Sequence, residues 1–133
     1  MNTVNKIGVL TSGGDSPGMN AAVRAVVRMA CHNDLQVIGI RYGYQGLINE
    51  DIVELYESSV SNIIQRGGTI LKSARSKAFR TKEGRERAAD ILKKNEIDAL
   101  VVVGGDGSFT GASYLNQEHG IKVVGVPELL IMT

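Results

Sequence analysis

The chain has 133 residues, of which 43% are hydrophobic and 22% charged, and its formal net charge at pH 7 is +1. This length fits one ordinary domain or a piece of a larger protein, the hydrophobic fraction excludes a disordered chain, and the near-neutral charge argues against a general nucleic-acid binder. No apolar run nears the ~18 residues of a membrane span, and no signal-peptide pattern opens the chain. The single cysteine allows no internal disulfide. We therefore expect a cytoplasmic protein with no membrane or nucleic-acid partner.

The chain opens on a short strand that runs into a glycine-rich turn. Residues 6–11 (KIGVLT) are typical of a buried strand, and residues 12–18 (SGGDSPG) follow as a turn. A helix is expected over residues 19–30, because Ser16 or Asp15 can cap it and Pro17 suits its first turn. The first unit is therefore a strand, a Gly-Gly-Asp turn and a helix.

The middle of the chain is less regular. Residues 35–41 (LQVIGIR) predict a second strand, and residues 42–46, with two tyrosines, predict a turn. A short helix is expected over residues 60–65 and an extended piece over 69–71. Thr81 is a suitable cap for a helix that continues through Leu92, with Lys93 and Lys94 at its C-terminal end.

Basic residues gather between Lys72 and Arg87. Seven Lys and Arg stand against two Glu in these sixteen residues, a local charge of +5. Two interpretations stay open at this point: a solvated helix face beside a loop, or a basic rim around small phosphorylated ligands.

The central strand is expected over residues 97–103, followed by Gly-Gly-Asp-Gly-Ser at 104–108 and a helix that begins at 109. A buried strand that feeds a tight turn and a helix leaves the first helical N–H groups and the positive end of the helix dipole facing outward, which makes an anion site. The absence of a Cβ on glycine lets a phosphate approach the backbone. Asp106 at such a turn suggests a bound cation, so the stretch predicts a magnesium–nucleotide site.

Residues 121–126 (IKVVGV) predict a last strand. Strands that alternate with helices indicate an α/β fold with a doubly wound, mostly parallel sheet and helices on both faces. The two Gly-Gly-Asp turns are then expected to face one cleft at the carboxyl edge of the sheet.

Two common nucleotide motifs do not fit. The spacing from Gly13 to Gly18 starts like a P-loop, but Met19 stands where the phosphate-binding lysine belongs. The run from Gly105 fails the dinucleotide fingerprint at its third glycine, where Thr110 stands, although Glu128 lies where an acid that binds a ribose would be.

Four blocks together resemble the bacterial-type 6-phosphofructokinases: TSGGDSPGMNAA at 11–22, RGGT at 66–69, SAR at 73–75 and GGDGS at 104–108. They occur in the order and spacing of that family, and the resemblance runs from Lys6 to Pro127. It implies a Rossmann-like three-layer fold and transfer of the γ-phosphate of ATP to the 1-hydroxyl of fructose 6-phosphate, with Mg²⁺, in a homotetramer of glycolysis. Gly107 resembles the ATP-using members, whereas pyrophosphate-using members tend to carry Asp there.

The resemblance also implies roles for individual residues. Asp106 would meet the Mg²⁺, Tyr44 would lie near the adenine, and Arg75 would reach the transferring phosphoryl group as the catalytic arginine. The expected ATP-binding set is Gly14, Tyr44, Arg75, Ser76, Gly105, Asp106, Gly107 and Ser108. Structural alternatives stay open: Asp106 as a helix cap, Tyr44 as a packing residue and Arg75 as an exposed loop residue. Ser76 stands where the family usually has a larger residue.

Arg24 and Arg28 lie four residues apart and so share a helix face. In the family this position contributes to a site for the effectors ADP or phosphoenolpyruvate, and the alternative is a solvated stripe. Glu57 and Asn62 stand where an arginine and an aspartate are common, so we expect a weak effector response.

The final residues, 128–133 (ELLIMT), are expected to be an out-of-frame tail beyond an ATP-binding part at 1–127. The family continues Gly-Thr-Ile-Asp-Asn-Asp after the proline, and one coding of that run, GGA ACT ATT GAT AAT GAC, reads Glu-Leu-Leu-Ile-Met-Thr when its first base is lost. The general-base aspartate would then be absent, and we expect this chain to have no turnover. The alternatives are another GGDG-type kinase, acting on NAD or a lipid, and a non-catalytic nucleotide-binding fragment.

Overall fold

The computed structural model describes residues 4–13, 18–63 and 69–127. Several features expected from the sequence lie outside these residues. They are Gly14 and the helix cap at Asp15 or Ser16 with Pro17, residues 64–65 of the expected short helix, the Arg-Gly-Gly run at 66–68 and the tail at 128–133.

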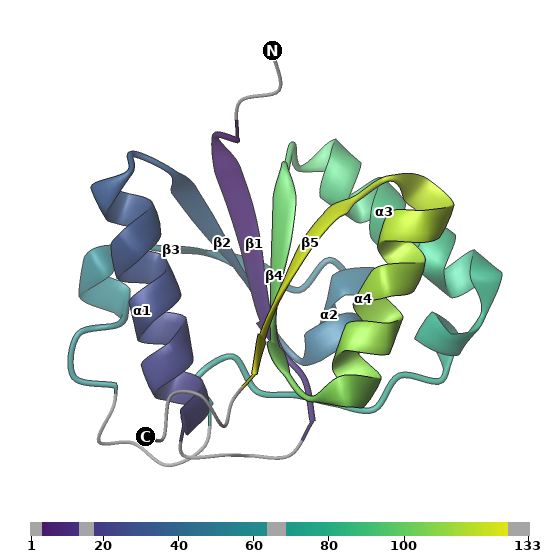
Figure 1. The fold of residues 1–133 in the computed structure, drawn as a ribbon, viewed down its shortest axis with the longest axis horizontal. Helices are drawn as coiled ribbons and strands as arrows, with labels where there is room; N and C mark the ends of the chain where they lie inside the picture. The colour runs from purple at the N-terminus through teal and green to yellow at the C-terminus, as the bar shows by residue number, and fades with distance from the viewer. Residues whose placement is uncertain (1–3, 14–17, 64–68, 128–133) are drawn as a thin grey trace.

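The described residues form one five-stranded sheet with the order β3-β2-β1-β4-β5 (Figure 1). The strands are β1 (Lys6–Thr11), β2 (Gln36–Ile40), β3 (Ile52–Leu55), β4 (Ala99–Gly104) and β5 (Lys122–Pro127). β1 pairs in parallel with β2 and β4, and β4 with β5, whereas β3 is antiparallel to β2. The mostly parallel sheet expected from the sequence is therefore confirmed.

Helices cover both faces of this sheet. They are α1 (Gly18–His32), α2 (Gly43–Ile48), α3 (Lys82–Lys94) and α4 (Asp106–His119), with 3-10 turns η1 (Glu57–Ser59) and η2 (Ala78–Arg80). In Figure 1, α1 lies on one side of the sheet and α2, α3 and α4 lie on the other.

The alternation of side chains along β1 and β4 builds two cores. Val9 and Val101 face α1, where Val23 and Val27 pack against them. Their neighbours Leu10, Leu100 and Val102 point to the opposite face and pack with residues of α2, α3 and α4. Because both faces are buried, every residue of β4 is apolar or glycine, which is the pattern of a central parallel strand.

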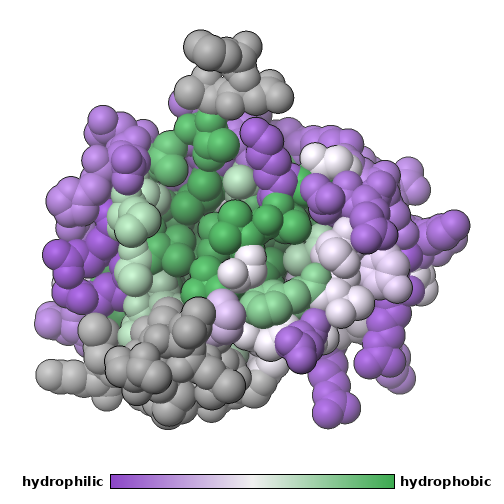
Figure 2. Space-filling model, in the orientation of Figure 1, coloured by the Kyte–Doolittle hydropathy of each residue, from purple (hydrophilic) through white to green (hydrophobic). Residues whose placement is uncertain are grey.

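β5 at the sheet edge is less covered than β4. None of its residues is buried, and Val124 is 52% exposed. Figure 2 shows hydrophobic residues gathered over the middle of this face of the molecule, between the polar borders. None of the helices in the described part is long and apolar enough to cross a membrane.

Two local expectations were wrong, and one strand was not expected. Residues 42–46 were expected to turn but lead into α2, because Tyr42 adopts a left-handed conformation (φ 62°) that starts the helix at Gly43. Residues 60–63 are not helical, and the short 3-10 turn lies just before them. The antiparallel strand β3 had no strong signal in the sequence, because a four-residue edge strand with two exposed residues has little apolar pattern.

Candidate functional site

The two glycine turns meet at the carboxyl edge of the sheet. The N–H of Ser12, just after β1, donates to the carbonyl of Val103 in β4 at 2.9 Å. A Cβ on Gly104 would lie 2.5 Å from the carbonyl oxygen of Ser12, so only glycine lets the two turns approach this closely. The expectation that both turns face one site is met for the described residues, Ser12 and Gly13 of the first turn and 104–108 of the second.

A third segment, residues 69–76, is tied to the same edge. The hydroxyls of Thr11 and Thr69 lie 3.0 Å apart, and Thr11 also donates to the carbonyl of Lys72 at 3.0 Å. The hydroxyl of Ser73 donates to the carbonyl of Gly13 at 2.7 Å. These bonds place Arg75 beside both glycine turns, although it comes from a distant part of the sequence.

Together these segments line a pocket of about 780 Å³ at the carboxyl edge. Its lining comes from four stretches of chain: Ser12, Gly13, Tyr44, Ser73, Ala74, Arg75, Ser76, Arg80, Gly107 and Ser108. Five of the expected ATP-binding residues are among them. Gly105 and Asp106 immediately precede this lining and are exposed, and Gly14 lies outside the described residues.

The second turn leaves open space in front of α4. A Cβ built on Gly105 or Gly107 would meet no atom within 4 Å, so packing inside the described chain does not require glycine at either position. At the start of a helix the first N–H groups lack intrahelical partners. A glycine there has no side chain to block them, so a phosphate can reach the backbone.

Asp106 is the first residue of α4 and does not cap it. The residue at the cap is Gly105, and no side chain of the described residues accepts a capping bond there. No group of three or more His, Cys, Asp or Glu that could hold a metal occurs among the described residues. A single exposed carboxylate can still take part in holding Mg²⁺, because this ion binds through one or two carboxylates together with substrate phosphates and water.

Tyr44 and Ser76 build the wall of the pocket. The Tyr44 ring is 8% exposed and stacks on Phe79, with centroids 4.0 Å apart and planes at 11°. Burial raises the pKa of Tyr44 well above its ordinary value, so its hydroxyl stays protonated. The Ser76 hydroxyl donates to Oε1 of Gln45 at 2.8 Å and accepts from the N–H of Phe79 at 3.1 Å. Both side chains thus have structural partners, whatever they contact in a ligand.

A second hollow of about 390 Å³ adjoins the first and shares Arg80 and Gly107 with it. Its other lining residues are Phe79, Arg85, Thr110, Gly111 and Tyr114. A Cβ on Gly111 would lie 3.0 Å from the Phe79 ring and 3.3 Å from the Tyr44 ring, so glycine lets these aromatic rings sit against α4. Neither Phe79 nor Tyr114 was predicted from the sequence to be a site residue. The signal that could have indicated Phe79 is its place beside Arg80 in the basic stretch.

Residues of the basic stretch from Lys72 to Arg87 do not all have the same role. Arg75 and Arg80 are exposed and line the pocket. Arg85 instead is buried in an ion pair with Glu118, and Arg87 donates to the carbonyl of Ile48 at 3.0 Å. The stretch is therefore partly a rim of the pocket and partly a set of packing contacts.

Arg24 and Arg28 lie on α1 and are not among the residues that line these hollows. Arg28 is exposed, and its Nε lies 3.7 Å from Oε1 of Glu57. A negative charge thus stands beside Arg28.

Comparison with known proteins decides the family. The family model described as phosphofructokinase matches residues 6–129, nearly the whole chain. The chain belongs to the phosphofructokinase family. A relative named ATP-dependent 6-phosphofructokinase from Thermotoga neapolitana is 59% identical over 124 residues, 93% of this chain and 39% of that relative. One of the same name from Clostridium botulinum is 62% identical over 121 residues, 91% of this chain and 38% of the relative.

Solved phosphofructokinases share the fold. The structure from Saccharomyces cerevisiae superposes with a TM-score of 0.88 at 40% identity, over 93% of this chain and 20% of that one. A pyrophosphate-dependent phosphofructokinase from Nitrosospira multiformis, with a TM-score of 0.83 at 20% identity over 94% of this chain and 34% of that one, supports the fold alone. This phosphofructokinase chain spans about two fifths of the length of the curated relatives quoted above.

Proposed function

We propose that this chain is the nucleotide-binding part of an ATP-dependent 6-phosphofructokinase, which transfers the γ-phosphate of ATP to the 1-hydroxyl of fructose 6-phosphate. The observation that carries the proposal is the pocket of about 780 Å³ in which Arg75 and the open glycine turn of α4 meet. The names of the relatives quoted above support ATP as the phosphoryl donor.

The nucleotide would occupy both of the adjoining hollows. The phosphates would lie in the larger one, against the N-terminus of α4 and between the exposed guanidinium groups of Arg75 and Arg80. The nucleoside would lie in the smaller one, which the Phe79 and Tyr114 rings line. Gly107 lines both hollows, which suits a position near the ribose that links the base to the phosphates.

The chemistry expected of these residues is positioning and charge stabilisation, which dominate phosphoryl transfer. Asp106 would hold Mg²⁺, which when bound neutralises charge on the phosphates. Arg75 would donate hydrogen bonds to the transferring phosphoryl group, and the N–H groups of the α4 start would hold the remaining phosphate oxygens.

Further features are proposed from the family resemblance. The general base would lie in the family segment Thr-Ile-Asp-Asn-Asp, which this sequence does not contain, so the 133-residue chain would bind ATP without turnover. In the intact protein we propose a cytoplasmic homotetramer, with Arg24 and Arg28 beside an effector site for ADP or phosphoenolpyruvate that Glu57 weakens.

The experiment is calorimetric titration of the purified chain with Mg–ATP, with pyrophosphate and with NAD, together with an assay for phosphorylation of fructose 6-phosphate. We expect binding of Mg–ATP in preference to the other two and no product. Failure to bind Mg–ATP would contradict the nucleotide site, and turnover would contradict the absence of the base.

A further inference from the structure

The partly buried ion pair between Arg85 and Glu118 joins two helices at the wall of the smaller hollow. Nε of Arg85 in α3 lies 2.7 Å from Oε1 of Glu118 in α4, and Nη2 lies 3.0 Å from Oε2, so the pair is bidentate. The two side chains are 9% and 26% exposed. This geometry fixes the plane of the guanidinium, because two parallel bonds resist its rotation.

Two more contacts hold the same guanidinium. Nη1 donates to the carbonyl of Phe79 in η2 at 3.2 Å, and the guanidinium carbon lies 4.7 Å from the centre of the Tyr114 ring. Arg85 therefore joins the three elements that enclose the hollow, η2, α3 and α4. The residue that Glu118 orients thus contacts the Tyr114 ring and the main chain of Phe79, both at this hollow.

The charge of Arg85 is compensated where it faces the hollow. Hydrogen bonds from Arg85 lower the pKa of Glu118, so the carboxylate is ionised at neutral pH. Arg75 and Arg80, in contrast, form no ion pair with any described residue. A negative phosphate is thus attracted to Arg75 and to Arg80, which the two hollows share, whereas the Arg85 side of the smaller hollow offers aromatic rings and a neutralised, planar ion pair.

We propose that Glu118 is a positioning residue that gives this chain its preference for a nucleotide over a bare phosphate chain. The inference rests on the proposed function. By holding Arg85 against Tyr114, Glu118 keeps the Arg85 side of the smaller hollow open and electrically neutral for an uncharged heteroaromatic base. Without Glu118, Arg85 would keep its positive charge and lose its fixed orientation, and the base would lose a preformed wall while the phosphate site stayed intact.

The test compares two ligands that share the phosphates and differ in the base. Mg–ATP and Mg–tripolyphosphate are titrated calorimetrically into the wild-type chain, Glu118→Gln and Glu118→Asp. Glu86→Gln is the matched control, because Glu86 lies on α3 directly after Arg85, is exposed and has no hydrogen bond or ion pair with any described residue. Circular dichroism checks that each variant is folded, and Glu118→Asp, which keeps the charge, serves if Glu118→Gln does not fold.

We expect Glu118→Gln to bind ATP about tenfold more weakly with unchanged affinity for tripolyphosphate, because a charge-assisted bidentate contact to the base wall is lost. Glu118→Asp should show a smaller loss of the same selectivity, and Glu86→Gln should match the wild type. Equal losses for both ligands, or no loss for ATP, would overturn the inference while leaving the proposed function standing. A wild-type chain that binds tripolyphosphate as tightly as ATP would overturn the role of the smaller hollow and with it the inference.

Discussion

The hydroxyl of Tyr44 donates a 2.5 Å hydrogen bond to the main-chain carbonyl of Ser108. It connects α2 to the first turn of α4, where the phosphates of the proposed nucleotide would lie. Tyr44 is buried and its ring stacks on Phe79, so its side chain is fixed in place. Its hydrogen bond therefore helps to hold the start of α4 in position, although Tyr44 is not part of the glycine turn.

Tyr44→Phe should keep the stacked ring pair and lose this bond. We expect the free energy of unfolding to fall by about 1 kcal/mol, because a buried hydrogen bond between the Tyr44 hydroxyl and the carbonyl of Ser108 is lost. Urea unfolding of the chain measures this. Tyr42→Phe is the control, since Tyr42 is 40% exposed and its hydroxyl bonds to none of the described residues. Equal stability of Tyr44→Phe and the wild type would show that the bond is not a net contributor.

Asp106→Asn should weaken Mg–ATP binding by more than about tenfold and leave Mg-free ATP binding nearly unchanged. The reason is that Asp106 is the exposed carboxylate beside the phosphate site and makes no capping bond to α4. Calorimetry with and without Mg²⁺ gives both affinities. The matched control is Asp90→Asn, an exposed aspartate on α3. If Asp106→Asn binds Mg–ATP like the wild type, Asp106 acts only as a negative charge near the helix start.

Gly107→Asp should separate folding from nucleotide binding. A Cβ at this position meets nothing within 4 Å, and a carboxylate is favoured at the start of a helix, so stability should stay the same or rise by up to about 1 kcal/mol. ATP affinity should nevertheless fall steeply, because the new carboxylate would repel the phosphates between the two hollows. Gly107→Ala is the matched variant that adds bulk without charge and should lose much less. An Asp variant that binds ATP normally would remove Gly107 from the site.

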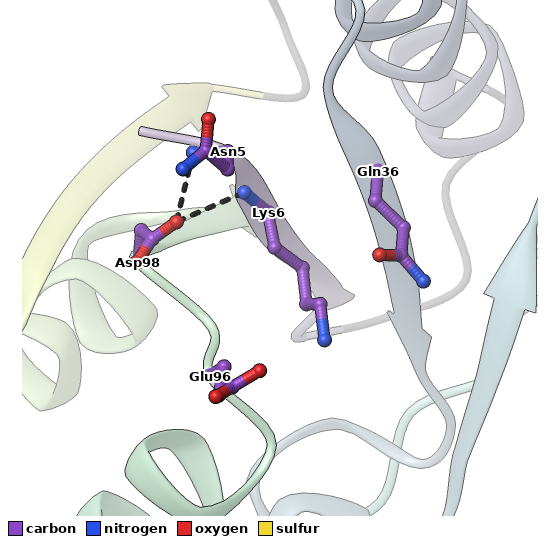
Figure 3. A pocket seen from close by; sticks show the side chains of 5 residues that line it. All are labelled: Asn5, Lys6, Gln36, Glu96 and Asp98. Carbon is purple, nitrogen blue, oxygen red and sulfur yellow. Dashed lines mark hydrogen bonds between the residues drawn. The ribbon is translucent and has the colours of Figure 1, made fainter. Parts of the chain in front are cut away.

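The hydrogen bonds of Asp98 predict that the stability of the fold decreases in acid. Its Oδ2 accepts from the N–H groups of Asn5 at 2.8 Å and Lys6 at 3.0 Å, at the opposite end of the sheet from the site (Figure 3). These bonds lower the pKa of Asp98 below its ordinary value. The stabilisation is therefore complete above the pKa of the unfolded chain, about 3.9, and is lost as pH falls through the lower pKa of the folded state.

Asp98→Asn should accordingly be less stable than the wild type at pH 7, and the difference should shrink as the pH falls below about 4. Urea midpoints measured between neutral pH and about pH 2 test this. Asp90→Asn, with an exposed carboxylate, should run parallel to the wild type. A difference between Asp98→Asn and the wild type that does not change with pH would contradict this account.

The contact between Arg28 and Glu57 bears on regulation. A full-length protein with this segment should respond little to ADP or phosphoenolpyruvate, because the Glu57 carboxylate, 3.7 Å from Arg28, competes with an anionic effector. The fructose 6-phosphate saturation curve with and without each effector measures the response. Glu57→Ala should increase it, and Glu86→Ala should not. A large shift in the unaltered protein would contradict the expected loss of regulation.

The candidate site could be predicted from the sequence where its signals are local. The strand β4, the turn after it and the start of α4 follow one another within a few residues, so the apolar run, the paired glycines and Asp106 indicate them directly. Arg75 required the family resemblance, because the bonds from Thr11 and Ser73 that bring its segment to the site join residues about sixty positions apart. The roles of Arg75 and Ser76 in binding a ligand stay predictions.

By itself the sequence determined the mostly parallel α/β sheet, its two glycine turns and the family, because these depend on hydrophobic period, glycine placement and motif order along the chain. Only the tertiary structure decided how the basic stretch is used. Arg85 and Arg80 are indistinguishable as charges in the sequence, but Arg85 is buried against Glu118, 33 residues away, while Arg80 remains exposed at the pocket. Burial and pairing depend on which distant side chain the fold brings within reach, and that is a property of packing in three dimensions.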